Sequence, residues 1–286
     1  MLGIIGTIIL DGLLLFFLMR KNKRFPFKKK DYFILAAIAV GAVLFSIIAS
    51  GFAQVSIYYM FRRRYFYLDG EWYWYYKKSL IFYTWVNHLF GVALIEEFAK
   101  HILLFLQLKT KKVRTYLDCI TSFLFVGVLF AVIEDIKYYV NYDVTYRFIG
   151  ALSGHLMFSM IVGGFYYRYM VNKKIVILDR FLKDVGAVDS SVRVKGCSKI
   201  ILTCGFLLAV ALHTLYNFLA SLYPVLWIIC LVLYGVIFII LYIGALKNKL
   251  ILSKAIERYE KLQSQVNKKQ IFELITQNIE TKKTII

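Results

Sequence analysis

The sequence predicts an all-α polytopic membrane protein with about seven transmembrane helices. Three observations support this: the apolar composition, the long apolar segments and the placement of the basic residues. Of the 286 residues 60% are hydrophobic, the mean hydropathy is +0.65 and only two prolines occur. These values are typical of helical membrane proteins rather than of soluble globules. The lipid bilayer is therefore the main solvent for which this chain is built.

Seven segments are long enough to cross a hydrocarbon core about 30 Å thick, which takes roughly 20 helical residues. They lie at about 2–19, 33–60, 79–107, 116–140, 147–169, 199–222 and 225–246. Only Tyr223 and Pro224 separate the last two segments, so these two should form a tight helical hairpin. The first segment has basic residues after it and none before it, which predicts a retained anchor rather than a cleavable signal peptide.

The Lys and Arg residues predict the orientation of the helices. Loops that would share one side, at 20–31, 108–115 and 168–199, contain nineteen of these residues, whereas the loops of the other side contain six. By the positive-inside rule the N-terminus lies outside and the C-terminus in the cytoplasm. The net charge of +19 follows from this topology and does not indicate nucleic acid, because the basic residues form short clusters between apolar runs.

We expect a transmembrane domain over residues 1–246, with its polar core at 96–217, followed by a cytosolic amphipathic tail over residues 247–286. The tail contains LILSKAIERYEKL, which has helical periodicity. The loop YFYLDGEWYWYYKK is rich in Trp and Tyr and fits an interfacial aromatic belt, with a substrate-docking surface as the alternative. The four cysteines lack paired spacing and are predicted to be free thiols.

Ionisable residues inside the predicted spans are functional-site candidates, because burying each one costs about 3 kcal/mol or more. They are Asp11, His88, Glu96, Glu97, Lys100, His101, Glu134, Asp135, Lys137, His155 and His213. At about 1.5 Å per residue, Glu96, His155 and His213 lie roughly 18, 20 and 21 Å from the cytoplasmic ends of their helices. Glu134 lies farther out, at roughly 27 Å, close to the outer interface. Four helices therefore bring acids and imidazoles to a similar depth.

Helical spacing favours a shared cavity for these groups. Glu96 and Lys100 are four residues apart, as are His213 and Asn217, so each pair shares one face of its helix. Small residues around His155 would let neighbouring helices approach closely.

A carboxylate with two histidines and a second acid is a minimal set for activating water. Glutamate can act as a general base, or a bound divalent metal such as zinc can make its water acidic. His213 and Asn217 would stabilise the developing oxyanion, and Lys100 would keep a neighbouring glutamate ionised. The sequence contains no His-Glu-x-x-His and no Gly-x-Gly-Asp, and GALSGH has Ala151 where rhomboid serine proteases need Gly. We expect hydrolysis inside the membrane; metal ligands, if a metal takes part, would be Glu96, Glu97, His155 and His213.

Four motifs in order resemble the PrsW family of bacterial intramembrane proteases. They are Glu96-Glu97-x-x-Lys100, GVLFAVIED at 127–135, His155 followed by glycines, and HTLYN at 213–217. The broader group includes CAAX-processing and bacteriocin-immunity type membrane endopeptidases. By motif position, the resemblance implies that the functional residues are Glu96, Glu97, Lys100, Glu134, His155, His213 and Asn217.

The resemblance also implies a place and a substrate. It implies an endopeptidase of the bacterial cytoplasmic membrane that makes the first, outer-side cut in a single-span anti-sigma factor and so releases sigma-factor-dependent stress transcription. It is compatible with water activation by glutamate alone and with a metallopeptidase.

Two other functions stay open at the level of sequence. A proton- or cation-coupled transporter also places acids and histidines on several helices, although no inverted repeat and no Gly/Pro-broken helix pair is found. A catalytically inactive relative of the bacteriocin-immunity type would bind a peptide without cutting it. The intact set of polar residues argues against that reading.

Overall fold

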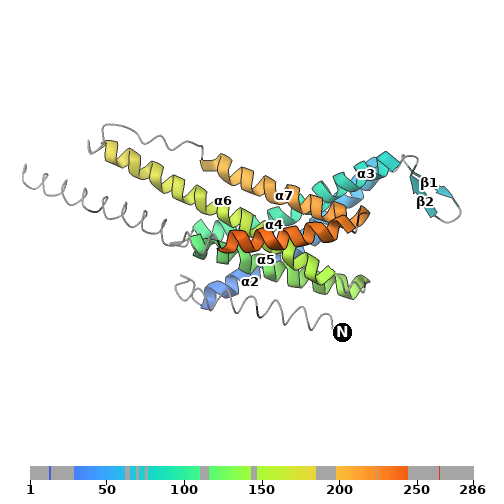
Figure 1. The fold of residues 1–286 in the computed structure, drawn as a ribbon, viewed down its shortest axis with the longest axis horizontal. Helices are drawn as coiled ribbons and strands as arrows, with labels where there is room; N and C mark the ends of the chain where they lie inside the picture. Colours follow the sequence, from blue (N-terminus) through green and yellow to red (C-terminus); the bar gives the residue numbers. More distant parts are fainter. Residues whose placement is uncertain are drawn as a thin grey trace, which may run out of the picture.

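The computed structural model describes residue 13, residues 29–61, 65–68, 71–74, 77–109, 116–142, 147–184, 198–223 and 225–243, and residue 264. Over these residues the chain forms a bundle of long helices with one small β-hairpin (Figure 1). The elements are α2 (Lys29–Phe61), β1 (Tyr65–Leu68), β2 (Glu71–Trp74), α3 (Lys77–Val86), the π-helical segment η2 (Asn87–Ala93), α4 (Leu94–Lys109), α5 (Tyr116–Tyr142), α6 (Arg147–Asp184), α7 (Ser198–Leu222) and a last helix over Val225–Ile243. The predicted helical class is confirmed.

Among the described residues, four helical segments are long and apolar enough to cross a membrane. They are Lys30–Phe61, Cys119–Ile136, Lys199–Leu222 and Val225–Ile243. The predicted third span is a helical run through α3, η2 and α4, and the predicted fifth span forms part of the longer helix α6. The predicted first span with its Asp11, apart from residue 13, and the tail at 247–286, apart from residue 264, lie outside the described residues. The count of seven crossings and the N-outside orientation stay predictions.

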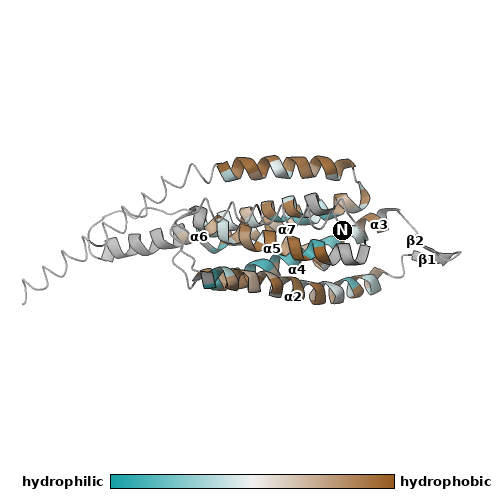
Figure 2. Cartoon of the chain, turned by 90° about the horizontal axis from the view of Figure 1, so that it is seen from below, coloured by the Kyte–Doolittle hydropathy of each residue, from teal (hydrophilic) through white to brown (hydrophobic). Residues whose placement is uncertain are grey.

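The helices enclose a common centre. α5 packs against α6, α6 against α7 and α7 against η2, and α2 closes the ring against η2, α4 and α5. Hydrophilic residues of α4 lie inside this ring, between helices that are mainly hydrophobic (Figure 2). The outward residues of α2 and of the Val225–Ile243 helix are large and apolar, with Phe52 and Val225 more than 70% exposed. Such a surface suits contact with lipid rather than with water.

One end of the bundle carries the β-hairpin, and we call it the hairpin end; α2 and α7 end there and α3 begins there (Figure 1). β1 and β2 pair antiparallel, from Tyr65 opposite Trp74 to Leu68 opposite Glu71. The sequence predicted an interfacial belt for this aromatic loop, and that stays a prediction; the structure adds a β-hairpin within it. Its signal is Asp-Gly between two runs of aromatic residues, because that pair favours the tight turns of two-residue hairpins.

Helices α5 and α6 come very close at Gly127. A Cβ atom there would overlap the Oγ atom of Ser159 and would lie 3.1 Å from the carbonyl oxygen of His155. Ser159 is one turn from His155, and Gly127 is two turns from Glu134. The missing side chain at 127 therefore sets the separation of the two helices that carry Glu134 and His155.

Gly127→Ala is expected to lower the free energy of unfolding by about 1–3 kcal/mol, because overpacking forces neighbouring atoms apart. Gly235→Ala is the matched control, since nothing lies within 4 Å of a Cβ atom at that position. Thermal unfolding of the two purified variants in detergent measures the difference. Equal midpoints would contradict the close approach of α5 and α6.

Candidate active site

The structure brings six of the seven predicted site residues together in the centre of the bundle. All six are buried, with at most 7% of each residue exposed: Glu96, Glu97, Lys100, Glu134, His155 and His213. They come from α4, α5, α6 and α7. The seventh, Asn217, lies one turn after His213 on α7 and is half-buried. These side chains thus converge on one buried centre, and their roles in chemistry stay predictions.

A π-helical segment, η2, leads directly into the glutamates. It inserts extra residues per turn before Leu94, and such segments are frequent at functional sites. η2 packs against α2 and α7, and a Cβ atom at Gly91 would lie only 3.0 Å from Cγ of Gln54 on α2. Neighbouring helix residues point about 100° apart, so the rotation of α4 decides where each acid is directed. Sequence periodicity gave no signal for this segment.

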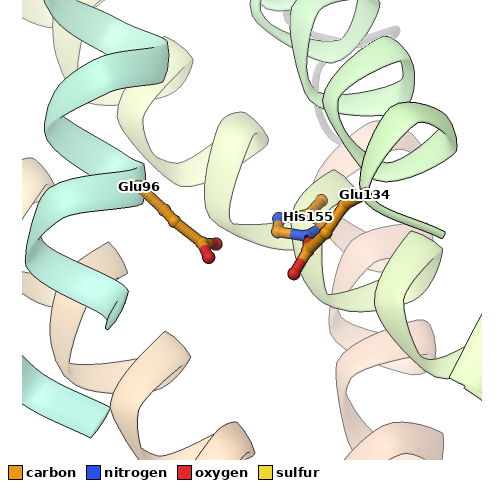
Figure 3. Close-up of side chains that lie close together, drawn as sticks. All are labelled: Glu96, Glu134 and His155. Atoms are coloured by element: carbon orange, nitrogen blue, oxygen red, sulfur yellow. Dashed lines mark hydrogen bonds and ion pairs between the residues drawn. The ribbon is translucent and has the colours of Figure 1, made fainter. Parts of the chain in front are cut away.

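Glu96, Glu134 and His155 form the first of two groups in the site. Each offers one ligand atom, and these three atoms lie within 4.8 Å of one another. Figure 3 shows Glu96 on α4 directed toward Glu134 and His155, which lie side by side on the facing helices. The Nε2 atom of His155 is 2.8 Å from Oε2 of Glu134. Three helices thus contribute one oxygen or nitrogen donor each to a single small volume.

Glu97 is the centre of the second group. Its Oε1 atom accepts hydrogen bonds from the Lys100 ammonium and from Nδ1 of His213, the latter at 2.8 Å. His101 donates from Nδ1 to the Glu97 carbonyl oxygen at 2.7 Å. The sequence did not say which neighbouring glutamate Lys100 would keep ionised, and the structure pairs it with Glu97, three residues away, rather than with Glu96, four residues away. Both spacings place residues on one helix face, so spacing alone did not decide between them.

Lys100 links the two groups. Its Nζ atom lies 3.0 Å from Nδ1 of His155 and 4.7 Å from the centre of the Phe130 ring. An ammonium group has donors and no acceptor, so Nδ1 of His155 accepts this hydrogen bond. The proton of the neutral ring then sits on Nε2, which donates it to Glu134. One buried cation therefore defines both the charge of Glu97 and the tautomer of His155.

His213 lies between the two glutamates. Its Nδ1 atom is bonded to Glu97, and its Nε2 atom faces Oε2 of Glu96 at 3.7 Å. The ring stacks on Phe158, with centroids 4.8 Å apart and planes inclined by 17°. Because Nδ1 donates to the carboxylate, Nε2 carries the lone pair and is directed at the first group.

The last helix supports His213 although it carries no Asp, Glu, Lys, Arg or His. Tyr234 is 4% exposed, and its hydroxyl donates a 2.8 Å hydrogen bond to the carbonyl oxygen of Leu212, in the peptide bond that leads into His213. The Tyr234 ring also packs edge-on against Phe158 at 5.9 Å. The predicted tight connection between the last two helices, with α7 ending at Leu222 and the next helix beginning at Val225, is confirmed.

Tyr234→Phe is expected to reduce turnover with little change in substrate KM, because loss of one hydrogen bond, worth about 1 kcal/mol, lets the His213 backbone shift. Tyr242→Phe on the same helix is the control, since Tyr242 stacks on Phe238 away from the site. Steady-state peptide cleavage measures both variants. An equal loss in the two would assign the effect to general weakening of the helix.

The structure places Glu134 beside the other site residues. Counting residues from the helix ends put it farther out than Glu96 and His155, whereas its carboxylate is bonded to His155 and only 4% of the residue is exposed. The helices cross obliquely (Figure 1), so equal distances along their axes are not equal depths. His101 is also buried, stacked on Phe123 at 5.6 Å, and His88 lies outside the group, bonded to Ser221.

The first group fits a divalent metal. Two carboxylates and one imidazole from three helices are a donor set that suits zinc and similar ions. A metal at Nε2 of His155 would replace the hydrogen bond to Glu134 and displace its proton, as metal binding to protonated ligands requires. Of the four expected ligands, this group contains Glu96 and His155, and it also contains Glu134. Glu97 and His213 lie beside it, held by one another.

One family model matches this chain, described as PrsW family intramembrane metalloprotease, over residues 29–245. The matched range includes every residue of the two groups. No curated protein and no solved structure shows a significant match to the chain.

Proposed function

This chain belongs to the PrsW family of intramembrane metalloproteases, a multi-pass membrane peptidase, and we propose that it makes the outer-side cut in a single-span, membrane-anchored anti-sigma factor. The observation that carries the proposal is the pair of linked groups in the bundle centre. A metal-ligand set, Glu96, Glu134 and His155, stands next to a carboxylate–imidazole pair, Glu97 and His213. A proton or cation carrier is no longer the alternative, because the family is one of peptidases.

The ligand set and the carboxylate–imidazole pair have different roles in this proposal. Glu96, Glu134 and His155 would hold the metal, which would supply Lewis-acid polarisation of the scissile carbonyl and lower the pKa of bound water. Glu97 accepts the Nδ1 proton of His213 and so presents the Nε2 lone pair to the reacting centre, as in other acid–imidazole pairs. His213 takes the proton of the attacking water and returns it to the leaving amine. Lys100 balances the charge of Glu97.

The position of the site supports an outer-side cut. Glu134 lies eight residues before the end of α5 at Tyr142, and His155 eight residues after the start of α6 at Arg147. Both are about 12 Å along the helix axis from the end of α5 and the start of α6, which lie on the same side of the bundle as the hairpin (Figure 1). The distribution of basic residues predicts that this end faces outside. A bond cut at this level lies in the outer half of the membrane, next to the anchor segment of a single-span substrate.

Co-expression with a tagged single-span anti-sigma factor tests the proposal. We expect a shortened product with the wild-type chain and none with Glu96→Ala, Glu134→Ala or His155→Ala. Phe98→Ala is the matched control on the same helix as Glu96, because Phe98 is 47% exposed on the lipid side, and it should cleave normally. Cleavage that persists in all three site variants would contradict the assignment. Absence of cleavage by the wild-type chain of any single-span protein offered would favour an inactive relative.

A further inference from the structure

Burial of the site raises the question of how water reaches it. Glu97 is 0% exposed, and His155 and His213 are each 3% exposed. On the function proposed above, each peptide bond that is cut consumes one water molecule at this depth. Water could reach the site from the hairpin end or from the opposite end of the bundle. The residues that lie between the site and each end differ, and this difference indicates the route.

The direction away from the hairpin end is closed by aromatic rings. His101 stacks on Phe123, and Phe105 stacks on Tyr166 with centroids 5.2 Å apart and planes inclined by 12°. Phe123 and Tyr166 are 1% and 2% exposed, and Cys119 beside them is fully buried. We call Phe105, Phe123 and Tyr166 the aromatic plug. Close-packed apolar side chains leave no room for a file of water molecules.

The direction toward the hairpin end is lined by polar residues of α7. His213, Asn217 and Ser221 are spaced four residues apart and so share one face of the helix. Their exposure increases along this line, from buried His213 through half-buried Asn217 to exposed Ser221. We call these three residues the polar stripe. It leads from the reacting centre to the end of α7.

The polar stripe faces η2. The Ser221 hydroxyl donates to the carbonyl oxygen of Asn217 at 2.9 Å, so its oxygen accepts the 2.8 Å hydrogen bond from Nε2 of His88. The neighbouring contact between α3 and α7 is apolar, with Trp85 edge-on to Phe218 at 5.3 Å. A polar line therefore runs along the contact between α7 and η2, beside this apolar pair.

We propose that the water used in hydrolysis enters from the hairpin end along the polar stripe, past His88, and that the aromatic plug seals the opposite end. Side chains that donate and accept hydrogen bonds stabilise water at each step, which an apolar passage does not. The inference rests on the proposed function for its purpose, but the route itself is a property of the resting protein. It also names His88 and Ser221 as residues of the site's entrance.

Labelling of single-cysteine variants with a membrane-impermeant methanethiosulfonate tests the route. In each variant the native cysteines are replaced and one new cysteine is introduced, and the protein is labelled in lipid nanodiscs. Asn217→Cys is compared with Ala220→Cys, which is nearer the helix end but exposed on another face. His88→Cys is compared with Phe90→Cys, 51% exposed on η2. We expect the stripe and His88 positions to react at least about tenfold faster, because a thiol ionises in water and not in lipid. A variant retaining only native Cys119 should not react.

Equal or faster reaction at Ala220→Cys and Phe90→Cys would overturn the route, and reaction at Cys119 would overturn the seal. The two pairs lie on different helices, so failure of one variant to fold leaves the other decisive. Labelling does not require catalysis. The expected labelling in a chain that cuts no peptide would refute the proposed function alone, and cleavage without the expected labelling would refute the route alone.

Discussion

Glu97→Ala is expected to lower the free energy of unfolding by about 3–5 kcal/mol and to abolish cleavage, because it leaves a buried charge without its partner. Lys100 is 0% exposed, and its ammonium contacts the Glu97 carboxylate. The same substitution removes the acceptor for Nδ1 of His213. Two buried groups are thus left uncompensated by one change. Thermal or denaturant unfolding in detergent measures the first effect and the peptide cleavage assay measures the second.

A second substitution separates stability from chemistry. Adding Lys100→Met to Glu97→Ala removes the unpaired charge and is expected to restore most of the lost stability, because an apolar replacement of a buried ion pair is often neutral. Cleavage should stay absent, since His213 still lacks its carboxylate. Phe98→Ala, between the two residues on the lipid side, is the control for truncation alone. A Glu97→Ala protein of wild-type stability would refute the buried pair.

His155→Ala and Glu134→Ala are each expected to remove bound metal together with cleavage, whereas His213→Ala should keep the metal and lose about 10²–10⁴-fold in turnover, the usual contribution of an acid–base group. The reason is positional. His155 and Glu134 belong to the three residues whose donor atoms lie within 4.8 Å of one another, and His213 is bonded to Glu97 beside them. Elemental analysis of the purified variants, paired with the cleavage assay, gives both readings.

The outcomes of this experiment divide the two schemes of water activation. If His213→Ala loses metal to the same extent as His155→Ala, His213 is a metal ligand. If metal-free wild-type protein still cleaves in the presence of a chelator, a glutamate acts as the general base without a metal. In that case Glu96, at 3.7 Å from Nε2 of His213, becomes the first residue to test.

Much of the candidate site could be predicted from sequence because charged residues are rare inside apolar segments. Glu96, Glu97 and Lys100 stand out for this reason alone, and each proves to be buried in the centre of the bundle. The same argument selected Glu134, His155 and His213. Burial of charge in a membrane is expensive, so such residues are retained where several of them meet. The lengths of the apolar segments then predicted the spans of most helices.

The partners within the site could not be predicted in this way. Lys100 is at a permitted helical spacing from both Glu96 and Glu97, and only the rotation of α4 after the π-helical segment pairs it with Glu97. The contact between Glu134 and His155 was not evident either, because the crossing of helices is not visible in a count of residues. Tyr234 carries no charge and lies on an apolar helix, so no sequence pattern separated it from the lipid-facing residues around it.

The amino-acid sequence by itself determined that this protein is a helical membrane protein. It also determined which few ionisable side chains lie inside the apolar segments, since hydropathy and charge are properties of single residues. Only the tertiary structure decided that Glu96, Glu134 and His155 form one group and that Glu97 and His213 form a second beside it. That division depends on helix rotation, crossing and close approach, and these arise from contacts between segments far apart in the chain.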